Sequence, residues 1–396
     1  MGNESTRLRQ RIAAELGELR RQEQFRTLDR PAGINLLSND YLGLACDPRL
    51  ARALVEAVRR SGRVGSAGSR LLGGNAEEWE EAESEFAEFA GAEAALYFSS
   101  GYAANIGLLS ALLRPGDLVF SDALNHASLI DAMRLSGARK VIYPHRDIAR
   151  LEEELAHYRD DPAAKLIVTE SLFSMEGDRA PLRRLFELGR RYGAELVVDE
   201  AHAVGVLGPQ GRGLAAEAGI EREVLAILHT CGKALGSAGA FVCSSRTLRE
   251  FLVNRARTFI FSTASPPYLA RQISAAVTAA RGMDAERLHL QSISQRLCDG
   301  LREEGFDISS CDSQIVPLII GTNQAALAWA ESLREEGFAV RAIRPPTVAP
   351  GRARLRFSLT AALAESDIER LLRASIRARD CLAATRTTAS EGSLRR

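Results

Sequence analysis

Short apolar runs and longer segments of helical periodicity alternate through the first two thirds of the chain. The predicted strands are 94–98, 118–121, 140–143, 166–169, 195–198 and 224–228. Runs of four or five apolar residues are typical of strands buried on both faces. Helical patterns begin between them, near residues 102, 127, 148 and 182. This alternation predicts an α/β protein with a mostly parallel central sheet flanked by helices.

The start of the chain has a different pattern. Leu8, Ile12, Leu16 and Leu19 repeat at helical spacing, and the other faces of this segment are strongly charged. We therefore expect a surface helix over about 4–25. A short strand and a loop follow within 34–44, and another helix is predicted over 76–90. Residues 1–45 are taken as an N-terminal segment, and 46–267 as the large α/β domain.

After Pro266 and Pro267 the pattern predicts a smaller α+β domain, 268–384. Its expected helices and strands are two helical stretches over 268–305 broken near Gly282, strands at 315–320, 339–341 and 354–359, and helices at 325–336 and 365–381. Residues 385–396 are polar and lack apolar periodicity, so we expect a disordered tail there.

Composition narrows the class of protein. The 396 residues carry 51 positive and 51 negative side chains, which gives no sign of a nucleic acid partner or a membrane surface. The start of the chain lacks the apolar core of a secretion signal. The six cysteines show neither paired metal spacing nor a dense disulfide framework. Reduced thiols in a cytoplasmic protein without a bound metal are the simplest interpretation.

Lys233 is the strongest chemical candidate. It stands between Gly232 and Gly236, shortly after the apolar run 224–228. Glycines allow a tight turn and a close approach to a ligand. A lysine placed in a closed, apolar site at a strand end deprotonates more readily than one in water, and its neutral amine is a nucleophile. Lys233 is therefore the candidate for a Schiff base with pyridoxal phosphate (PLP).

Other candidates also follow predicted strand ends, where ligands of parallel α/β folds bind. Asp199 is expected to pair with the cofactor's ring nitrogen, and His202 with its ring hydroxyl oxygen. Gly101 and Tyr102 open a helix whose N-terminus suits the cofactor phosphate. His126 begins the next helix, where its imidazole is expected to lie against the ring. The hydroxyls expected at the cofactor are those of Ser174 and Thr230.

Five long motifs carry a resemblance to a known family. They are SNDYLGL (38–44), SDALNHASLIDAMRLS (121–136), VTESLFSMEGDRAPL (168–182), VVDEAHAVGVLGPQGRG (197–213) and TCGKALGSAGAFV (230–242). Together they resemble the α-oxoamine synthases, which condense an amino acid with an acyl thioester and lose carbon dioxide. The likeness extends over about 8–380 and implies fold type I of the PLP-dependent transferases.

Further expectations rest on this resemblance. The segment with Arg344, Pro345, Pro346 and Thr347 is similar to members that use L-alanine and a pimeloyl thioester in biotin synthesis, with coenzyme A or a carrier protein as the thiol. The family pattern implies Lys233 and His126 as catalytic groups beside Asp199. The residues that it implies for substrate binding are Arg26, Asn39, His126, Thr347 and Arg356. It also implies a homodimer, in which Ser262 or Thr263 reaches the partner's cofactor.

Two alternatives stay open. Leu363 follows a run in which the family usually has a histidine, so a sister enzyme that uses glycine, serine or another acyl thioester remains possible. A non-catalytic subunit that keeps the fold is the third interpretation, although such a subunit is expected to lose Lys233. The histidines at 145, 157, 229 and 289 are taken as structural.

Overall fold

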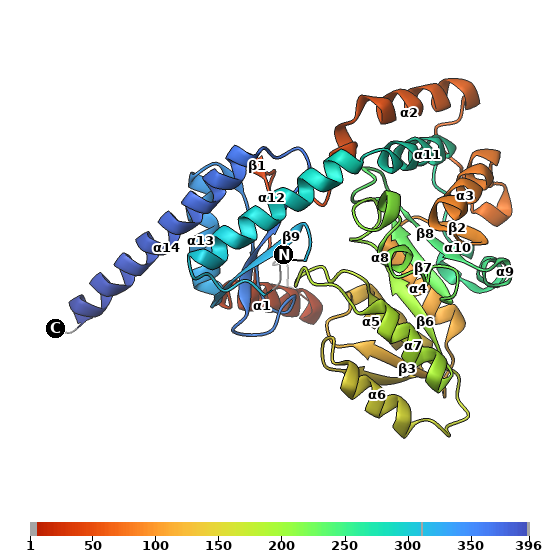
Figure 1. Cartoon of the computed structure of the whole chain (residues 1–396), viewed down its shortest axis with the longest axis horizontal. Coiled ribbons are helices and arrows are strands. Elements are labelled where there is room, and N and C mark those ends of the chain that lie inside the picture. The colour runs from red at the N-terminus through yellow and green to blue at the C-terminus, as the bar shows by residue number, and fades with distance from the viewer. Residues whose placement is uncertain (1–5, 310–311, 394–396) are drawn as a thin grey trace. The chain divides into compact units, whose positions relative to one another are not determined.

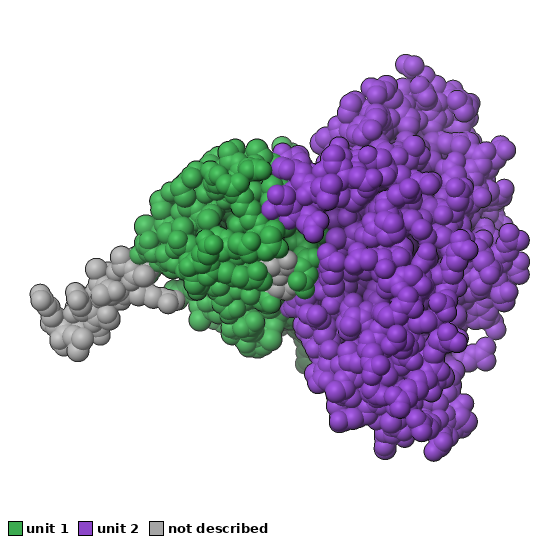
Figure 2. Space-filling model, in the orientation of Figure 1, with its two compact units in different colours: residues 1–38, 293–359, 363–396 green, residues 39–292, 360–362 purple. Residues whose placement is uncertain are grey.

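The computed structural model describes residues 6–309 and 312–393. The chain forms two compact units, shown in different colours in Figure 2. Unit 2 consists of residues 39–292 and 360–362, and unit 1 of 1–38, 293–359 and 363–396. Residues 6–38 thus pack with C-terminal segments, and the helix after Pro266 belongs to the large unit. The large domain was predicted over 46–267, whereas the main segment of unit 2 extends over 39–292.

Unit 2 is built on a seven-stranded sheet of order β2-β8-β7-β6-β5-β3-β4. The strands are β2 (Ala94–Phe98), β3 (Leu118–Asp122), β4 (Arg139–Tyr143), β5 (Lys165–Glu170), β6 (Ala194–Asp199), β7 (Ala226–Thr230) and β8 (Ala240–Ser244). All are parallel except β8, which runs antiparallel to both β2 and β7. The predicted mostly parallel sheet is confirmed.

Helices accompany the strands of this sheet along the chain (Figure 1). They are α2 (Pro48–Ser61), α3 (Glu77–Ala90), α4 (Gly101–Leu112), α5 (Ala127–Ser136), α6 (Ile148–His157), α7 (Leu182–Tyr192), α8 (Leu214–Glu217), α9 (Arg246–Arg255), α10 (Arg257–Ile260) and α11 (Pro267–Arg281). Side-chain caps fix several starts: Ser100 accepts from the amide of Ala103, and Asp147 from that of Arg150. These caps set where α4 and α6 begin.

The core of unit 2 explains why the strand runs are so apolar. β2, β3, β6, β7 and β8 are buried along nearly their whole length. Leu96, Val119, Val197 and Leu228 pack in one cluster with α4, α5 and α9. A sheet covered on both faces buries successive side chains, so its strands read as continuous apolar runs.

Unit 1 contains two small sheets. β9 (Ile315–Gly321), β12 (Ala353–Ser358) and β11 (Ala342–Ile343) form an antiparallel sheet, whereas β1 (Ile34–Asn35) pairs in parallel with β10 (Phe338–Ala339). Its helices are α1 (Arg7–Arg21), α13 (Asn323–Glu335), α14 (Glu365–Ser393) and the second part of α12 (Asp284–Glu303). The predicted α+β character of this part is confirmed.

Several elements differ from the predictions. The helices α2 and α9 and the strand β8 were not predicted. α14 continues to Ser393, so the tail expected to be disordered is helical as far as this residue, because extending an existing helix needs no new nucleus. Cys46, Cys231 and Cys243 are free thiols, but Cys298 is disulfide-bonded, so the expectation of reduced thiols is wrong there. None of the helices in the described residues combines the length and apolar character that crossing a bilayer requires.

Candidate active site

The candidate site lies in unit 2, where strands of the parallel sheet end. Asp199 is the last residue of β6 and Thr230 the last of β7, and Lys233 follows three residues later. Gly101 opens α4 three residues after β2, and His126 is the N-cap of α5 after β3. Because β3, β6 and β7 are parallel, their carboxyl ends lie along the same edge of the sheet.

Lys233 contacts one of the predicted histidines. Its Nζ lies 2.6 Å from Nε2 of His202, and Nδ1 of His202 lies 2.7 Å from the hydroxyl of Tyr41. That hydroxyl donates to Oδ1 of Asn39 at 3.0 Å. The three contacts are consistent with one order of donation, in which Lys233 donates to Nε2 of His202, His202 donates through Nδ1 to Tyr41, and Tyr41 donates to Asn39. Tyr41 and His202 are both buried. The chain of contacts fixes the imidazole beside the amine.

The turn that carries Lys233 depends on a glycine. Gly236 has φ of 58°, and its amide donates to the carbonyl of Lys233 at 2.9 Å. A Cβ at Gly236 would overlap the backbone of Leu44 and Ala45. Only glycine adopts this conformation without strain and allows this close approach. The lysine turn is thereby held against the end of the SNDYLGL motif.

Asp199 and His126 are joined through two residues that were not predicted. Asn105, on α4, donates through Nδ2 to Oδ2 of Asp199 at 2.7 Å and to Oγ of Ser128 at 2.9 Å. The Oγ of Ser128 lies 2.7 Å from Nδ1 of His126, which also accepts from the amide of Ser128. The pKa of His126 is lowered, by burial and by the charge of Lys233, while Asp199 opposes this shift. A neutral His126 that accepts through Nδ1 fits this network.

A second carboxyl group lies close by. Glu170 ends β5 and is 3% exposed. Burial, together with the charge of Asp199, raises its pKa well above the usual range, so a protonated and uncharged carboxyl is favoured. Its Oε2 accepts from the amide of Ser174 at 3.3 Å. Within the described part of the chain, Oε1 of Glu170 and Oδ1 of Asn105 have no hydrogen-bond partner, and such buried orphan atoms suit a ligand.

The predicted phosphate-binding segment is placed as expected on a helix start. The amides of Gly101 and Tyr102 belong to the first turn of α4, where amides have no partner within the helix. Thr230 lies beside Gly101, since a Cβ there would meet its Oγ1 at 3.9 Å. Tyr102 is itself exposed, and its hydroxyl contacts Asp131. The backbone at this helix start, rather than the phenol, is suited to an anion.

Three predicted substrate residues lie in unit 1. Arg26 donates through Nη2 to Oγ1 of Thr347 at 3.3 Å, and both line a cavity of about 480 Å³ with Arg344. Burial and the charge of Arg26 lower the pKa of Arg344. Arg356 lies on β12, is 8% exposed, and donates to Oγ of Ser358 at 2.7 Å. The structure therefore brings Arg26 and Thr347 together.

Thr263 lies apart from these contacts, in an exposed segment after α10. It lines a small surface hollow with Arg70 and Ser262. Its neighbour Phe261 is 71% exposed, which is unusual for an aromatic side chain. The assignment of Thr263 to a partner's cofactor remains a prediction.

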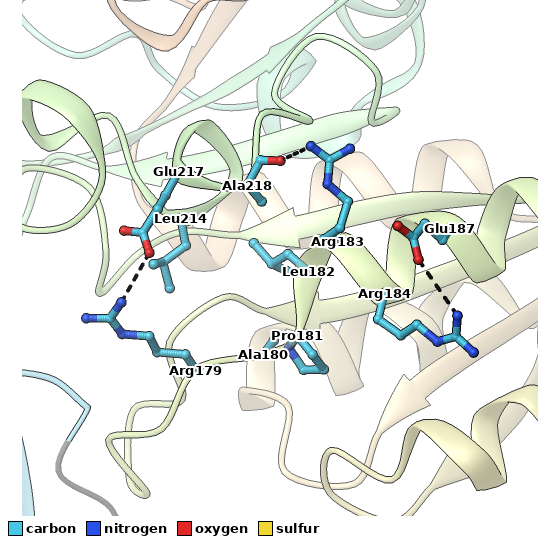
Figure 3. A pocket seen from close by; sticks show the side chains of 10 residues that line it. All are labelled: Arg179, Ala180, Pro181, Leu182, Arg183, Arg184, Glu187, Leu214, Glu217 and Ala218. Carbon is cyan, nitrogen blue, oxygen red and sulfur yellow. Dashed lines mark hydrogen bonds and ion pairs between the residues drawn. The ribbon is translucent and has the colours of Figure 1, made fainter.

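A larger surface hollow of about 400 Å³ lies elsewhere in unit 2, near α7 and α8 (Figure 3). Arg179 pairs with Glu217, Arg183 donates to the carbonyl of Ala218, and Arg184 pairs with Glu187 and Glu152. Since these guanidinium groups already have acceptors, the hollow is a poor anion site. No group of three or more histidine, cysteine and acidic side chains among the described residues is suited to a metal ion.

Comparisons with known proteins agree with this geometry. The profile of the family described as aminotransferase class I and II matches residues 31–374, and the chain belongs to this family. It is 46% identical over 385 residues to an 8-amino-7-oxononanoate synthase of Herminiimonas arsenicoxydans, covering 93% of this chain and 98% of that protein. A synthase of the same name from Geobacter sulfurreducens is 46% identical over 381 residues, covering 92% and 97%.

A solved structure of lower sequence identity also supports the fold. The serine palmitoyltransferase of S. paucimobilis, solved with PLP and myriocin bound, is similar with a TM-score of 0.86 and 30% identity. The match covers 94% of this chain and 98% of that chain. Serine palmitoyltransferase is an α-oxoamine synthase, so the resemblance to that family is confirmed.

Proposed function

We propose that this protein is an 8-amino-7-oxononanoate synthase, which condenses L-alanine with a pimeloyl thioester and releases carbon dioxide. The observation that carries the proposal is the contact between Lys233 and His202 at a sheet edge where Asp199 also lies. The identity of 46% to synthases of this name over more than nine tenths of the chain supports the same reaction.

The residues at this edge fit PLP. When bound, PLP supplies an aldehyde and a ring that withdraws electrons from the substrate's α-carbon. Lys233 holds the aldehyde, and Asp199 keeps a proton on the ring nitrogen. The first amides of α4, at Gly101 and Tyr102, bind the phosphate. The other groups proposed at the cofactor are His126 against the ring, His202 at the ring oxygen, and the hydroxyls of Ser174, Thr230 and the partner's Thr263.

The chain's own groups then divide the chemistry. Arg356 binds the carboxylate of alanine through two parallel hydrogen bonds. Lys233, oriented by His202, takes the proton from the α-carbon as a general base. That carbon forms a bond to the thioester carbonyl, the thiol carrier leaves, and the carboxyl group departs as carbon dioxide. His126 is uncharged in this arrangement and offers Nε2–H to a substrate oxygen, while Asn39 supports the substrate end through Tyr41.

The arginine-lined cavity of unit 1 supports an acyl substrate with a free carboxylate. Arg26 and Arg344 both line it, and two like charges in one cavity are stabilised by an anion. A pimeloyl chain carries a carboxylate at the end remote from the thioester. Arg26 and Thr347 are the proposed ligands of this acyl substrate. Coenzyme A and a carrier protein both remain candidates for the thiol.

A product assay tests the proposal. Purified protein with PLP is given alanine, glycine or serine, each with pimeloyl, acetyl or palmitoyl thioester, and products are identified by mass. We expect 8-amino-7-oxononanoate from alanine and the pimeloyl thioester, and no product from Lys233→Ala. Activity with glycine and the acetyl thioester alone would instead identify a sister enzyme, which the buried Leu363 keeps as the second candidate.

The quaternary and cellular context is proposed from the resemblance. We propose a cytoplasmic homodimer, and the exposed Phe261 next to Ser262 and Thr263 is consistent with a covered surface at this segment. Sedimentation at micromolar and nanomolar concentrations measures the assembly. A fully active monomer at high dilution contradicts the role assigned to Thr263.

A further inference from the structure

His145, which the motifs leave without a role, connects two loops of unit 2. It follows β4, and its imidazole is partly buried, with 21% of the side chain exposed. Nδ1 lies 2.9 Å from Oδ1 of Asp122, and Nε2 lies 3.0 Å from Oδ2 of Asp178. The ring also packs edge-on against Phe173, with centroids 4.4 Å apart at 89°. One side chain thus bridges two carboxylates that are 56 residues apart in the sequence.

The backbone next to His145 is arranged for the same two carboxylates. Arg146 has φ of 57°, a left-handed conformation that costs free energy for a residue with a side chain. In this conformation its amide donates to Oδ2 of Asp122 at 2.8 Å, and its Nη1 donates to Oδ2 of Asp178 at 2.8 Å. His145 and Arg146 therefore each bind both Asp122 and Asp178.

Each carboxylate belongs to a segment that carries a residue of the proposed cofactor site. Asp122 ends β3, and its Oδ1 also accepts from the amide of Leu124, two residues before His126. Asp178 closes a turn in which the amide of Phe173 donates to its carbonyl at 2.9 Å. Ser174 lies inside this turn. His145 is consequently linked on one side to the start of α5 and on the other to Ser174.

The charge state of this bridge follows from its neighbours. Burial lowers the pKa of His145, but hydrogen bonds and the charges of Asp122 and Asp178 outweigh it and raise the pKa to about 9. Burial alone would raise the pKa of Asp178. The hydrogen bonds and charges of His145 and Arg146 together have the larger effect, so the pKa of Asp178 lies below its usual value. At neutral pH the imidazolium donates from both nitrogens, which only a protonated histidine does.

We propose that His145 is a positioning residue of the cofactor site, holding segment 122–126 with His126 in a fixed relation to turn 173–178 with Ser174. This inference rests on the proposed function, because it assumes that His126 and Ser174 contact the cofactor. The bridge keeps His126, proposed to lie against the cofactor ring, at a fixed distance from Ser174, whose hydroxyl is proposed to contact the cofactor. Without it, the two segments are still joined through the sheet, through Arg146, and through Asn125, whose side chain spans from Ser121 to Val168 and Glu170, but the partly buried link between the two carboxylates is lost.

The test compares His145→Gln and Asp178→Asn with the wild-type holoenzyme. A glutamine donates to one carboxylate and turns its carbonyl oxygen toward the other, whereas Asp178→Asn keeps the bond between His145 and Asp122. We expect the dissociation constant of PLP to rise about tenfold in both variants, as loss of a charged hydrogen bond implies. We also expect an altered visible circular dichroism of the bound cofactor. His157→Gln, an exposed histidine of α6, is the matched control and should bind PLP as the wild type does.

A pH series separates positioning from general stability. The ratio of PLP affinity between wild type and His145→Gln should shrink as pH rises through about 9, because the wild type then loses one of the two imidazole donors. If His145→Gln does not fold, Asp178→Asn decides. Wild-type affinity and an unchanged cofactor spectrum in Asp178→Asn, or a ratio independent of pH, overturn the proposal. Borohydride labelling of Lys233 in the wild type tests the proposed function separately.

Discussion

The amine of Lys233 lies 2.6 Å from Nε2 of His202, and the opposite nitrogen of this imidazole lies 2.7 Å from the hydroxyl of Tyr41. His202 is therefore held from both sides by the protein. A group with both nitrogens engaged has a defined tautomer and a defined ring orientation. The residue proposed for the ring oxygen of the cofactor is thus oriented by the same contacts that orient the nucleophile.

Tyr41→Phe removes the hydroxyl that links His202 to Asn39 while keeping the buried ring. We expect kcat to fall about threefold to tenfold, since one net hydrogen bond contributes about 0.5–1.5 kcal/mol. Steady-state kinetics with alanine and the pimeloyl thioester measure the change. Tyr192→Phe, which makes the same substitution at a hydroxyl that contacts Glu152, should leave kcat unchanged. Equal losses in both variants would show that the effect is one of general packing.

Asn105→Ala removes the donor shared by Asp199 and Ser128. Asp199 is 5% exposed, so loss of one donor leaves a buried carboxylate less well stabilised. We expect PLP affinity to fall about tenfold, which corresponds to about 1.4 kcal/mol. Equilibrium dialysis of the cofactor measures this. Asn254→Ala on α9, where the amide only donates to the carbonyl of Glu250, is the control. Unchanged affinity in Asn105→Ala would contradict the role of the network.

Arg26→Gln tests the acyl site of unit 1. A lost contact to a carboxylate costs about 1.5–3 kcal/mol, so we expect KM for the pimeloyl thioester to rise about tenfold to a hundredfold. KM for alanine should stay near its wild-type value, because Arg356 is the residue proposed for its carboxylate. The nearby exposed Arg30→Gln serves as control. A rise in KM for alanine instead would assign Arg26 to the other substrate.

His229 is expected to make the fold sensitive to acid. It is fully buried against Phe86, and burial, then Arg212, lower its pKa to about 3. Below pH ~6.5 this histidine is protonated in the unfolded chain but stays neutral in the folded chain. The free energy of unfolding therefore falls as pH drops, by about 2 kcal/mol at pH 5. His229→Leu should lose this dependence. Urea midpoints at pH 7 and pH 5 compare the two proteins; equal shifts in both would contradict the assignment.

The parts of the fold that the sequence predicted are those with a local signal. Strand 94–98 matches the structure at both ends, and the helix predicted from about 148 begins at Ile148, because the strand is buried on both faces and the helix has a clear apolar stripe and an aspartate cap. α2 was missed, and only Leu50 of its side chains is buried. β8 was missed because its antiparallel pairing with β2 and β7 is a tertiary property. The apolar run at Ala240–Ser244 does not indicate in which direction the strand runs within the sheet.

In the candidate site too, residues with a local sequence signal were predicted and those defined by tertiary contacts were not. Position after a strand end singled out Lys233, Asp199 and Thr230, and the structure places all three at strand ends. Tyr41, Asn105 and Ser128 were not recognised as part of it, since a polar residue inside a motif or helix does not reveal which face it occupies. Asn105 lies one turn after Gly101 on α4, and this i, i+4 spacing was a usable signal. The hydrogen bonds among them could only be seen in three dimensions.

The pairing of Ile34 with Phe338 has a consequence for how the polypeptide is made. Residues 39–292 are continuous and contain every strand of the large sheet, so this portion can complete its core while the ribosome is still translating the rest. The first 38 residues must wait, since their β-partner is synthesised some three hundred codons later. During that interval the leading segment is available to chaperones and proteases, and a nascent chain stalled before Phe338 should leave it open to cleavage.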